Sequence, residues 1–284
     1  MSRIAYVNGR FIRHSLAAVH VEDRGYQFAD AVYEVITIVR GCLIDDQLHF
    51  ERLERSLAEI RMEMPFSRAI FRLKVAELLR LNKLTSGSLY LQVSRGVAPR
   101  NHRIPHPLTP SVVMTLRPSR PVPQEVLENG VPVITVPDVR WKRSDIKSVA
   151  LLANVLAKDD AVQHDVYEAW QVTPEGIVTE GTSTNAWIVK GGHLITHPAA
   201  NAILNGVTRL ALLKIATELG IEFEERPFSV AEAYLADEAF LSSSSAFLVP
   251  IVRIDTTKIG AGIPGPVATE LLARYKDRIW SSNA

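Results

Sequence analysis

The segment Arg117–Gln124, RPSRPVPQ, contains three prolines in eight residues and most constrains how the chain can fold. Proline-rich segments of this kind are extended and act as spacers between folded parts. At 284 residues the chain is long enough for two ordinary domains, each with its own hydrophobic core. The sequence therefore predicts a first domain over residues 1–116, a linker over 117–124 and a second domain over 125–284.

The part before the linker has the pattern of an α+β unit. Asn8-Gly9 supplies two turn positions that tolerate positive φ, so the segments on either side predict a β-hairpin. Further strands are expected over residues 32–39, 89–94 and 112–116. Between them, apolar residues spaced three and four apart predict two amphipathic helices. The apolar faces consist of Leu53, Leu57, Ile60 and Met64 on the first helix and Phe71, Val75, Leu78 and Leu79 on the second.

The part after the linker alternates short apolar strands with helices. The helices are expected near residues 149–164, 207–219 and 266–280, and Gly220 is well placed to end the second of them. The expected strands cover residues 133–136, 168–172, 186–189 and 239–241. A ligand site between the two domains is the usual expectation for such an arrangement.

Composition excludes several classes of partner and site. Thirty-two basic and 31 acidic residues leave a net charge of +1, so we expect neither nucleic acid nor an acidic membrane as a partner. The single cysteine, Cys42, rules out an internal disulfide, and the N-terminus lacks the apolar core of a signal peptide, so a cytoplasmic location is expected. No metal site is predicted, because Pro105 and Pro107 forbid the helix that would bring His102 and His106 together and the sequence has no zinc motif.

Lys147 is the first candidate for chemistry. It lies in WKRSDIKSVALLANVLAK, residues 141–158, which predicts a strand end, a polar crossing and then an apolar helix. A lysine that loses its hydration at such a junction becomes a nucleophile. The alternative is an ordinary solvated surface lysine.

Two hydroxyl-bearing segments are candidates for binding an anion. Asn205-Gly206 precedes the helix expected at residue 207, where exposed N–H groups and the Thr208 hydroxyl could bind phosphate. Ser242–Ser245 follows a predicted strand and could add donors to the same anion. The alternatives are an ordinary helix N-terminus and a plain polar loop.

Two charged residues, Arg52 and Glu180, are the remaining candidates for a functional site. Arg52 begins an amphipathic helix, where its guanidinium could bind a phosphate through two parallel hydrogen bonds, although exposed arginine is commoner. Glu180 precedes Gly181 at a strand end and is either aimed inward or an ordinary hairpin acid. A lysine that can form an imine, a phosphate site and an isolated carboxylate are what pyridoxal phosphate (PLP) requires.

At these residues the chain resembles the class IV aminotransferases, the PLP enzymes of fold type IV, and within them it is most similar to the D-amino-acid aminotransferases. The resemblance implies an α+β fold with a smaller N-terminal α/β domain and a larger C-terminal pseudo-barrel domain surrounded by helices. It runs nearly end to end through EDRGYQFADAVYEV (22–35), the 48–53 segment with His49 and Arg52, RGVAPRNH (95–102), RWKRSDIKS (140–148), VTEGTSTN (178–185) and ILNGVTR (203–209).

The resemblance assigns a role to each candidate. It implies that Lys147 forms a Schiff base with PLP and moves the proton at the substrate Cα, and that Glu180 pairs with the pyridine nitrogen. The other residues that it places around the cofactor are Arg52, Gly206, Val207 and Thr208 at the phosphate, Ser243 and Ser244 at its edge, and Leu204 against the ring.

The resemblance also implies the substrate class and the assembly. Tyr33, Arg100 and His102 match the family's site for the substrate α-carboxylate, in a homodimer where Arg100 and His102 serve the neighbouring subunit. An Arg-x-His pair is typical of enzymes for D-amino acids, so we expect transfer from a D-amino acid such as D-alanine to a 2-oxo acid such as 2-oxoglutarate, with ping-pong kinetics.

Three alternatives remain open: a branched-chain L-amino-acid aminotransferase, an (R)-amine transaminase, and a protein that binds PLP without turnover. The chain also departs from the family at Ala29 and Ala31, where glycines are frequent, and in the run Ser242–Ser245, which lacks the usual threonine. These departures leave the side-chain pocket open.

Overall fold

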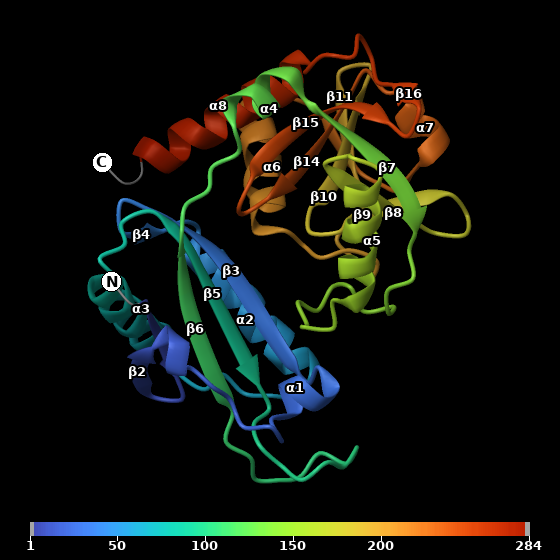
Figure 1. Ribbon diagram of the computed structural model, residues 1–284. Helices are drawn as coiled ribbons and strands as arrows, with labels where there is room; N and C mark the ends of the chain where they lie inside the picture. Colours follow the sequence, from blue (N-terminus) through green and yellow to red (C-terminus); the bar gives the residue numbers. More distant parts are fainter. Residues whose placement is uncertain (1–2, 282–284) are drawn as a thin grey trace. The chain divides into compact units, whose positions relative to one another are not determined.

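The computed structural model of the chain describes residues 3–281 and divides into two compact units (Figure 1). Of the described residues, the N-terminal unit contains those up to Arg120 together with Ile146–Ala150, and the C-terminal unit contains Pro121–Asp145 and residues 151–281. The segment with Lys147 therefore packs with the N-terminal unit, whereas the sequence placed it in the second domain. No helix within the described residues is long and apolar enough to cross a membrane.

The N-terminal unit is built on a six-stranded antiparallel sheet with the order β2-β1-β6-β5-β3-β4. The predicted hairpin is confirmed, because Asn8 and Gly9 have φ values of 47° and 91° and connect the first two strands. Arg117 and Pro118, expected in the linker, extend β6. The strands are β1 (Ile4–Val7), β2 (Arg10–Arg13), β3 (Ala31–Val39), β4 (Cys42–Leu43), β5 (Gly87–Ser94) and β6 (Ser111–Pro118).

Two helices supply the apolar side chains that complete this unit's core. They are α2 (Asp46–Glu59) and α3 (Arg68–Asn82), and the buried side chains of both cluster with those of the sheet. Each fully buried Leu, Val or Phe contributes about 1.5–3 kcal/mol to stability. The prediction that the first helix reaches Met64 was wrong, because it ends at Glu59 and Arg61 turns the chain with a φ of 59°. The unit also contains η1 (His14–Leu16) and α1 (Arg24–Phe28).

The C-terminal unit is built on a ten-stranded sheet, and all the strands and helices predicted after the linker are present with small shifts at their ends. Gly220, with a φ of 69°, follows the second predicted helix as expected. The strands are β7 (Val131–Pro137), β8 (Glu168–Val172), β9 (Ile177–Gly181), β10 (Asn185–Lys190), β11 (His193–Thr196), β12 (Phe223–Glu225), β13 (Phe228–Ser229), β14 (Glu238–Ser243), β15 (Phe247–Ile254) and β16 (Thr257–Lys258). The helices are α4 (Gln124–Asn129), α5 (Leu152–Gln163), α6 (Val207–Glu218), α7 (Val230–Tyr234) and α8 (Pro266–Ser281).

Chain connectivity forces this second sheet to curl. Its strand order is β12-β11-β10-β14-β15-β7-β8-β9-β13, so β9 and β10 lie five positions apart in it, although only residues 182–184 connect them. In a flat sheet, five strand positions would separate β9 from β10 by about 24 Å, whereas a connection of three residues spans at most about 15 Å. The sheet therefore bends back on itself into a partial barrel, which confirms the expected fold. This curvature brings the end of β9 to the start of β10.

Candidate active site

The predicted site residues fall into two groups, one in each unit. The N-terminal unit carries Tyr33, Arg52, Arg100, His102 and Lys147. The C-terminal unit carries Glu180, Leu204, Gly206, Val207, Thr208, Ser243 and Ser244.

Lys147 lies on a short extended segment that pairs with β3. Ser148 forms an antiparallel bridge with Val32, the Tyr33 N–H donates to the Lys147 carbonyl at 3.0 Å, and the Lys147 N–H donates to Ser56 Oγ at 3.3 Å. The expected strand-to-helix junction is therefore corrected, because residues 138–151 are irregular and the helix begins only at Leu152. These backbone hydrogen bonds fix the lysine, and its Nζ lies 4.3 Å from the centre of the Tyr33 ring.

Arg52 is held by a buried carboxylate that the sequence reasoning missed. Its Nε and Nη2 donate to the two oxygens of Glu34, each at 2.8 Å, and His49 Nδ1 lies 2.7 Å from Glu34 Oε2. Glu34 therefore occupies the Nε–Nη2 edge of the guanidinium with two parallel hydrogen bonds. Since Glu34 is on β3 and the other two side chains are on α2, the cluster also ties the helix to the sheet.

Burial and charge shift the pKa values of this cluster. Burial alone would raise the pKa of Glu34, but the charge of Arg52 and hydrogen bonds from Arg52 and His49 lower it to about 2. Burial lowers the pKa of His49, more than its hydrogen bond to Glu34 raises it. The folded protein therefore holds an ionised Glu34 against a neutral His49 whose Nδ1 carries the proton.

These shifts predict a loss of stability in acid. Both folded pKa values lie below the unfolded ones, so the unfolded chain binds more protons and the free energy of unfolding decreases as the pH falls. The contribution of His49 is complete above about pH 6.5 and is lost below it, and that of Glu34, about 3 kcal/mol, is lost between about pH 4.5 and 2. Urea unfolding followed by circular dichroism between pH 8 and 2 measures both losses.

A histidine variant isolates the first step. In His49→Gln the decrease between pH 7 and 5 becomes shallower than in the wild type, whereas His164→Gln, at an exposed position on the other unit, retains the full slope. Equal slopes in the wild type and His49→Gln would contradict the assignment of a lowered pKa to His49.

The three residues expected at the substrate carboxylate form two separate groups. Tyr33, on β3, lies beside Lys147 and stacks on Tyr90 with the ring centroids 5.8 Å apart. Arg100 and His102 are exposed on the loop between β5 and β6, and both lie against the ring of Phe28. The sequence pattern identified the Arg-x-His pair but not the phenylalanine that it contacts.

In the C-terminal unit, Glu180 is buried and fully bonded, which excludes the alternative of an ordinary hairpin acid. One carboxylate oxygen accepts from Arg140, and the other accepts from the Leu204 N–H at 3.1 Å and from Asn185 Nδ2 at 3.3 Å. Arg140 is itself held by two bonds to Asp138, at 2.9 and 2.7 Å. The carboxylate is therefore aimed by three donors from different segments.

Arg140 and Asp138 keep the network charged. Burial alone would lower the pKa of Arg140, but Asp138 and Glu180 raise it. Burial alone would raise the pKa of Asp138, but Arg140 lowers it. Neither Arg140 nor Asp138 is among the site residues predicted from the sequence. The available signal was an acid and an arginine two residues apart, directly after a strand.

The start of α6 has the features of an anion site. Gly206 precedes the helix, and a Cβ there would lie 2.1 Å from Asn185 Oδ1, so any other residue would displace the Asn185 side chain. Thr208 is 1% exposed, and within residues 3–281 its hydroxyl has no hydrogen-bond partner. An unpartnered buried hydroxyl beside free helix N–H groups is costly unless a ligand accepts from it. These residues fit a bound phosphate group.

Asn185 connects this site to the serine run. Its side chain donates to the Leu204 carbonyl at 2.9 Å as well as to Glu180, and its backbone pairs with Ser242. Ser243 and Ser244 follow directly, and Ser243 Oγ accepts from the Ala246 N–H at 3.2 Å, which closes the turn before β15. The curled sheet therefore brings the predicted carboxylate, the predicted phosphate residues and the serines to one place in this unit.

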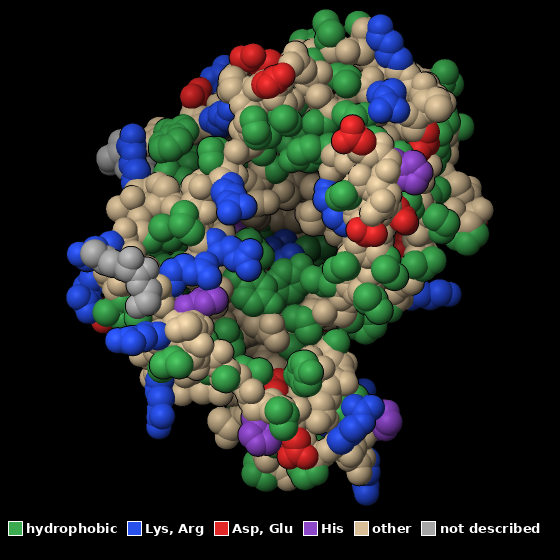
Figure 2. All heavy atoms as spheres, in the orientation of Figure 1, with side chains coloured by type: hydrophobic (Ala, Val, Ile, Leu, Met, Phe, Trp, Pro, Cys, Tyr) green, Lys and Arg blue, Asp and Glu red, His purple; other side chains and the backbone are tan. Residues whose placement is uncertain are grey.

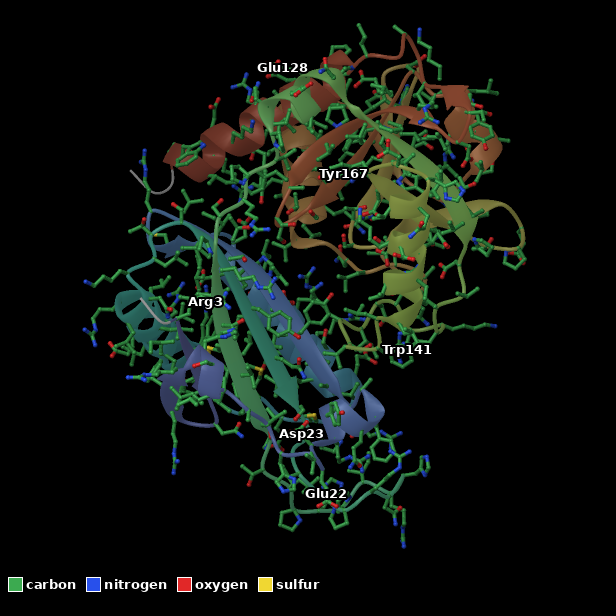
Figure 3. The ribbon with its side chains drawn as sticks, in the orientation of Figure 1. Arg3, Glu22, Asp23, Glu128, Trp141 and Tyr167 are labelled. Carbon is green, nitrogen blue, oxygen red and sulfur yellow. The ribbon has the colours of Figure 1, made fainter. Side chains whose placement is uncertain are left out.

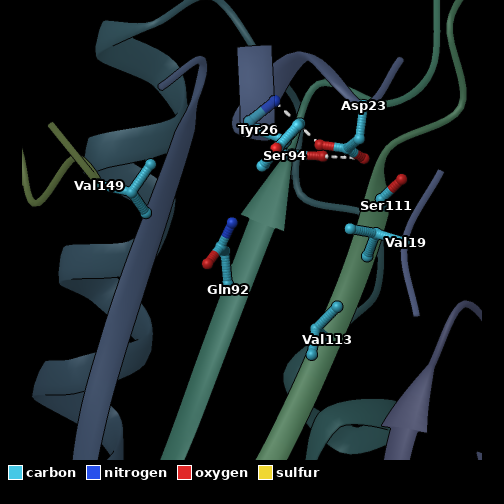
Figure 4. Close-up of a pocket in the computed structure, with 9 residues that line it drawn as sticks. Val19, Asp23, Tyr26, Gln92, Ser94, Ser111, Val113 and Val149 are labelled. Atoms are coloured by element: carbon cyan, nitrogen blue, oxygen red, sulfur yellow. Dashed lines mark hydrogen bonds between the residues drawn. The ribbon is translucent and has the colours of Figure 1, made fainter. Parts of the chain in front are cut away.

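A separate cavity of about 320 Å³ lies in the N-terminal unit (Figure 4). Its lining includes Asp23, Tyr26, Gln92, Ser94 and Val149. None of the residues found to line it belongs to the predicted set. The cavity therefore does not mark the predicted site.

Comparison with known proteins identifies the family. The model of the family described as Amino-transferase class IV matches residues 31–254. D-Alanine aminotransferase of Bacillus licheniformis is 42% identical over 277 residues, which cover 98% of this chain and 97% of that protein. The branched-chain amino acid aminotransferase of Escherichia coli has a TM-score of 0.90 at 26% identity, covering 98% of this chain and 94% of the other. That of Thermobaculum terrenum, in its PLP form, has a TM-score of 0.84 at 27% identity, covering 99% and 94%. The resemblance is thereby confirmed, and the chain belongs to the class IV aminotransferases.

Proposed function

We propose that this chain is a D-amino-acid aminotransferase, which passes the amino group of a D-amino acid such as D-alanine to a 2-oxo acid such as 2-oxoglutarate. The observation that carries the substrate class is the 42% identity to a D-alanine aminotransferase over nearly the whole of both chains. The branched-chain enzymes share the fold at 26–27% identity. The Arg100-x-His102 pair supports the same assignment, because an arginine binds a carboxylate through two parallel bonds.

The cofactor is PLP, and when bound it supplies an electron-accepting ring conjugated to the substrate Cα. We propose that Lys147 would hold the cofactor at its aldehyde carbon and that the same amine would move the proton at the substrate Cα. The Tyr33 ring and the pairing of residues 147–149 with β3 hold this amine in place. Lys147 as a whole residue is half-buried.

The remaining residues bind and orient. Glu180, fixed by Arg140, Asn185 and the Leu204 N–H, places a negative charge for a protonated ring nitrogen. The N–H groups at the start of α6 and the Thr208 hydroxyl bind phosphate, and we assign Arg52 to the same phosphate group. Leu204 packs against the ring, and Ser243 and Ser244 lie at the phosphate edge. Tyr33, Arg100 and His102 bind the substrate carboxylate.

Substrate handedness is tested by the first half-reaction. Purified, PLP-loaded protein is mixed with D-alanine, L-alanine, L-leucine or L-glutamate, and conversion of the cofactor from the aldehyde to the amine form is followed by absorbance. We expect D-alanine to react at least about 100-fold faster than its L-isomer, because the inverted Cα directs its hydrogen away from the lysine. Faster conversion with L-leucine would instead support a branched-chain L-enzyme, the activity of the solved relatives.

We also propose a homodimer, in which Arg100 and His102 serve the partner's site. Helix α5 supports an association, since it leaves Leu152, Val155 and Leu156 between 57% and 73% exposed, and apolar side chains reach the surface around it in Figure 2. Light scattering is expected to give twice the 31.5 kDa chain mass, and Leu156→Glu is expected to lower it. A wild-type mass of one chain at micromolar concentration would contradict the proposal.

A cytoplasmic location is proposed as well. Cys42, the only cysteine in the sequence, is free and exposed, and a reducing compartment keeps such a thiol reduced. Cell fractionation with the protein in the membrane or exported fraction would contradict this.

A further inference from the structure

The Arg-x-His pair lies on a long loop, which by itself would leave the two side chains mobile. Arg100 and His102 are both exposed, on the connection between β5 and β6. Within the described residues, the one hydrogen bond found for the Arg100 side chain is a long one, 3.5 Å, to the Gln27 carbonyl. A carboxylate site needs its donors held in place before the substrate arrives. Another contact must therefore set their geometry.

That contact is the ring of Phe28, the last residue of α1. The Arg100 guanidinium carbon lies 4.7 Å from the ring centroid, and the His102 ring centroid lies 5.4 Å from it. A guanidinium over an aromatic face is attracted by the ring and keeps its N–H edge available. Phe28 is only half-buried, and it is not part of the apolar core of its unit. The Phe28 ring thus contacts both side chains of the Arg-x-His pair.

Arg24, one turn earlier on α1, holds the loop backbone. Its Nη1 donates to the carbonyl of Asn101 at 2.7 Å and to that of Arg103 at 3.3 Å, on either side of His102. Its guanidinium carbon is also 4.8 Å from the Phe28 centroid. Arg24 is 4% exposed, and its Nε donates to Asp30 at 2.8 Å. A buried arginine paired with a carboxylate is a rigid support.

Asp30 and Asp23 fix α1 itself. Burial alone would raise the pKa of Asp30, but Arg95 and Arg24 lower it, so it stays charged between them. Asp23 accepts from the Gly25 N–H and from Ser94 Oγ, each at 2.9 Å (Figure 4).

The backbone beside this helix start joins the same loop. Asp23 forms a bridge with Val97, and the Ala98 N–H donates to the Glu22 carbonyl at 3.3 Å. The helix start and the beginning of the loop accordingly run side by side (Figure 3). Both ends of the Arg100–His102 segment are therefore tied to α1.

We infer that Phe28 and Arg24 are positioning residues that set the Arg100–His102 pair for the substrate carboxylate. Phe28 orients the two side chains, and Arg24 fixes the backbone that carries them. This rests on the proposed function, in which Arg100 and His102 bind that carboxylate. Neither positioning residue touches the reacting atoms, so their loss weakens the binding of substrates with a carboxylate and leaves the chemical step intact.

The test compares Phe28→Leu with Tyr26→Leu, a matched change at a 76% exposed position on the same helix. Single-turnover kinetics with D-alanine and D-alaninamide, whose carboxylate is replaced by a neutral amide, separate the two effects. We expect Phe28→Leu to raise the apparent Kd for D-alanine about 10-fold and to leave its limiting rate and all D-alaninamide constants unchanged. Propionate, a carboxylate that cannot react, is expected to bind about 10-fold more weakly by calorimetry. Phe28→Tyr, which keeps the aromatic face, is expected to restore both affinities.

Other variants separate the possible failures. Arg24→Lys keeps the charge but loses the guanidinium that binds Asp30 through Nε and the two carbonyls through Nη1 at the same time. It is therefore expected to weaken propionate binding even if Phe28→Leu does not fold. If Arg100→Ala leaves the D-alanine and propionate affinities unchanged, the proposed carboxylate site is wrong. If Arg100→Ala weakens both while Phe28→Leu and Arg24→Lys do not, the carboxylate site stands and the positioning role is wrong.

Discussion

Replacement of Lys147 by alanine is expected to abolish transamination and to remove the visible absorption band that PLP gives when bonded to a protein amine. In the proposed mechanism the variant loses both the covalent link to the cofactor and the base that moves the Cα proton, and general acid–base catalysis alone is worth about 100- to 10,000-fold. Turnover of D-alanine with 2-oxoglutarate should therefore fall by at least about 10,000-fold. The half-reaction assay and an absorbance spectrum of the purified variant measure both.

The fold should survive this change. Lys147 is held through its backbone N–H and carbonyl, to Ser56 and Tyr33, and alanine retains both groups. The matched control is Lys142→Ala, an exposed lysine in the same irregular segment, for which we expect wild-type turnover and spectrum. A Lys147→Ala variant that still shows the visible band, or turns over above the stated limit, would contradict the assignment.

Local patterns predicted most of the fold. Asn-Gly fixed the first hairpin through positive φ, and apolar periodicity located α2, α3 and the strands that they cover. Met64 shows the limit of that signal. Its spacing continues the apolar face of α2, but Arg61 adopts a φ of 59° and ends the helical path. Periodicity does not report where a backbone turns.

The position of Lys147 illustrates a second limit. Nothing local distinguishes a polar crossing before a helix from an extended segment that pairs with a strand more than a hundred residues earlier. The bridge between Val32 and Ser148 is such a pairing, and it places the lysine with the N-terminal unit. Long-range partners of this kind are set by the whole fold.

The same limit applies to charged partners. The sequence pattern identified Arg52 and Glu180, but the residues that hold them, Glu34 and Arg140, lie 18 and 40 positions away. Ala29 differs, because its departure from the family can be explained locally. It ends α1 with a φ of 55°, a left-handed conformation that costs a non-glycine residue about 1 kcal/mol, which accounts for the glycine frequent there.

Replacement of Glu180 by glutamine is expected to slow the first half-reaction with D-alanine by about 100- to 1,000-fold, the usual effect of removing one preorganised electrostatic contact in an active site. Glutamine keeps the size of the side chain and can still accept from Asn185 and the Leu204 N–H. It loses the negative charge that, in the proposed role of Glu180, keeps the ring nitrogen protonated, so the ring is expected to accept electrons less readily. Stopped-flow absorbance at saturating D-alanine measures the rate.

Stability separates this effect from a structural one. Arg140 keeps both bonds to Asp138 in the Glu180→Gln variant, so no unpaired buried cation is created and the melting temperature should change by only a few degrees. Glu175→Gln, an exposed acid in the connection between β8 and β9, is the matched control and should retain the wild-type rate. If Glu180→Gln reacts slowly but melts at the wild-type temperature, the loss of rate comes from the chemical step and not from unfolding. A wild-type half-reaction rate in Glu180→Gln would instead mean that this buried carboxylate serves only to bind Arg140, and another acid would have to partner the ring nitrogen.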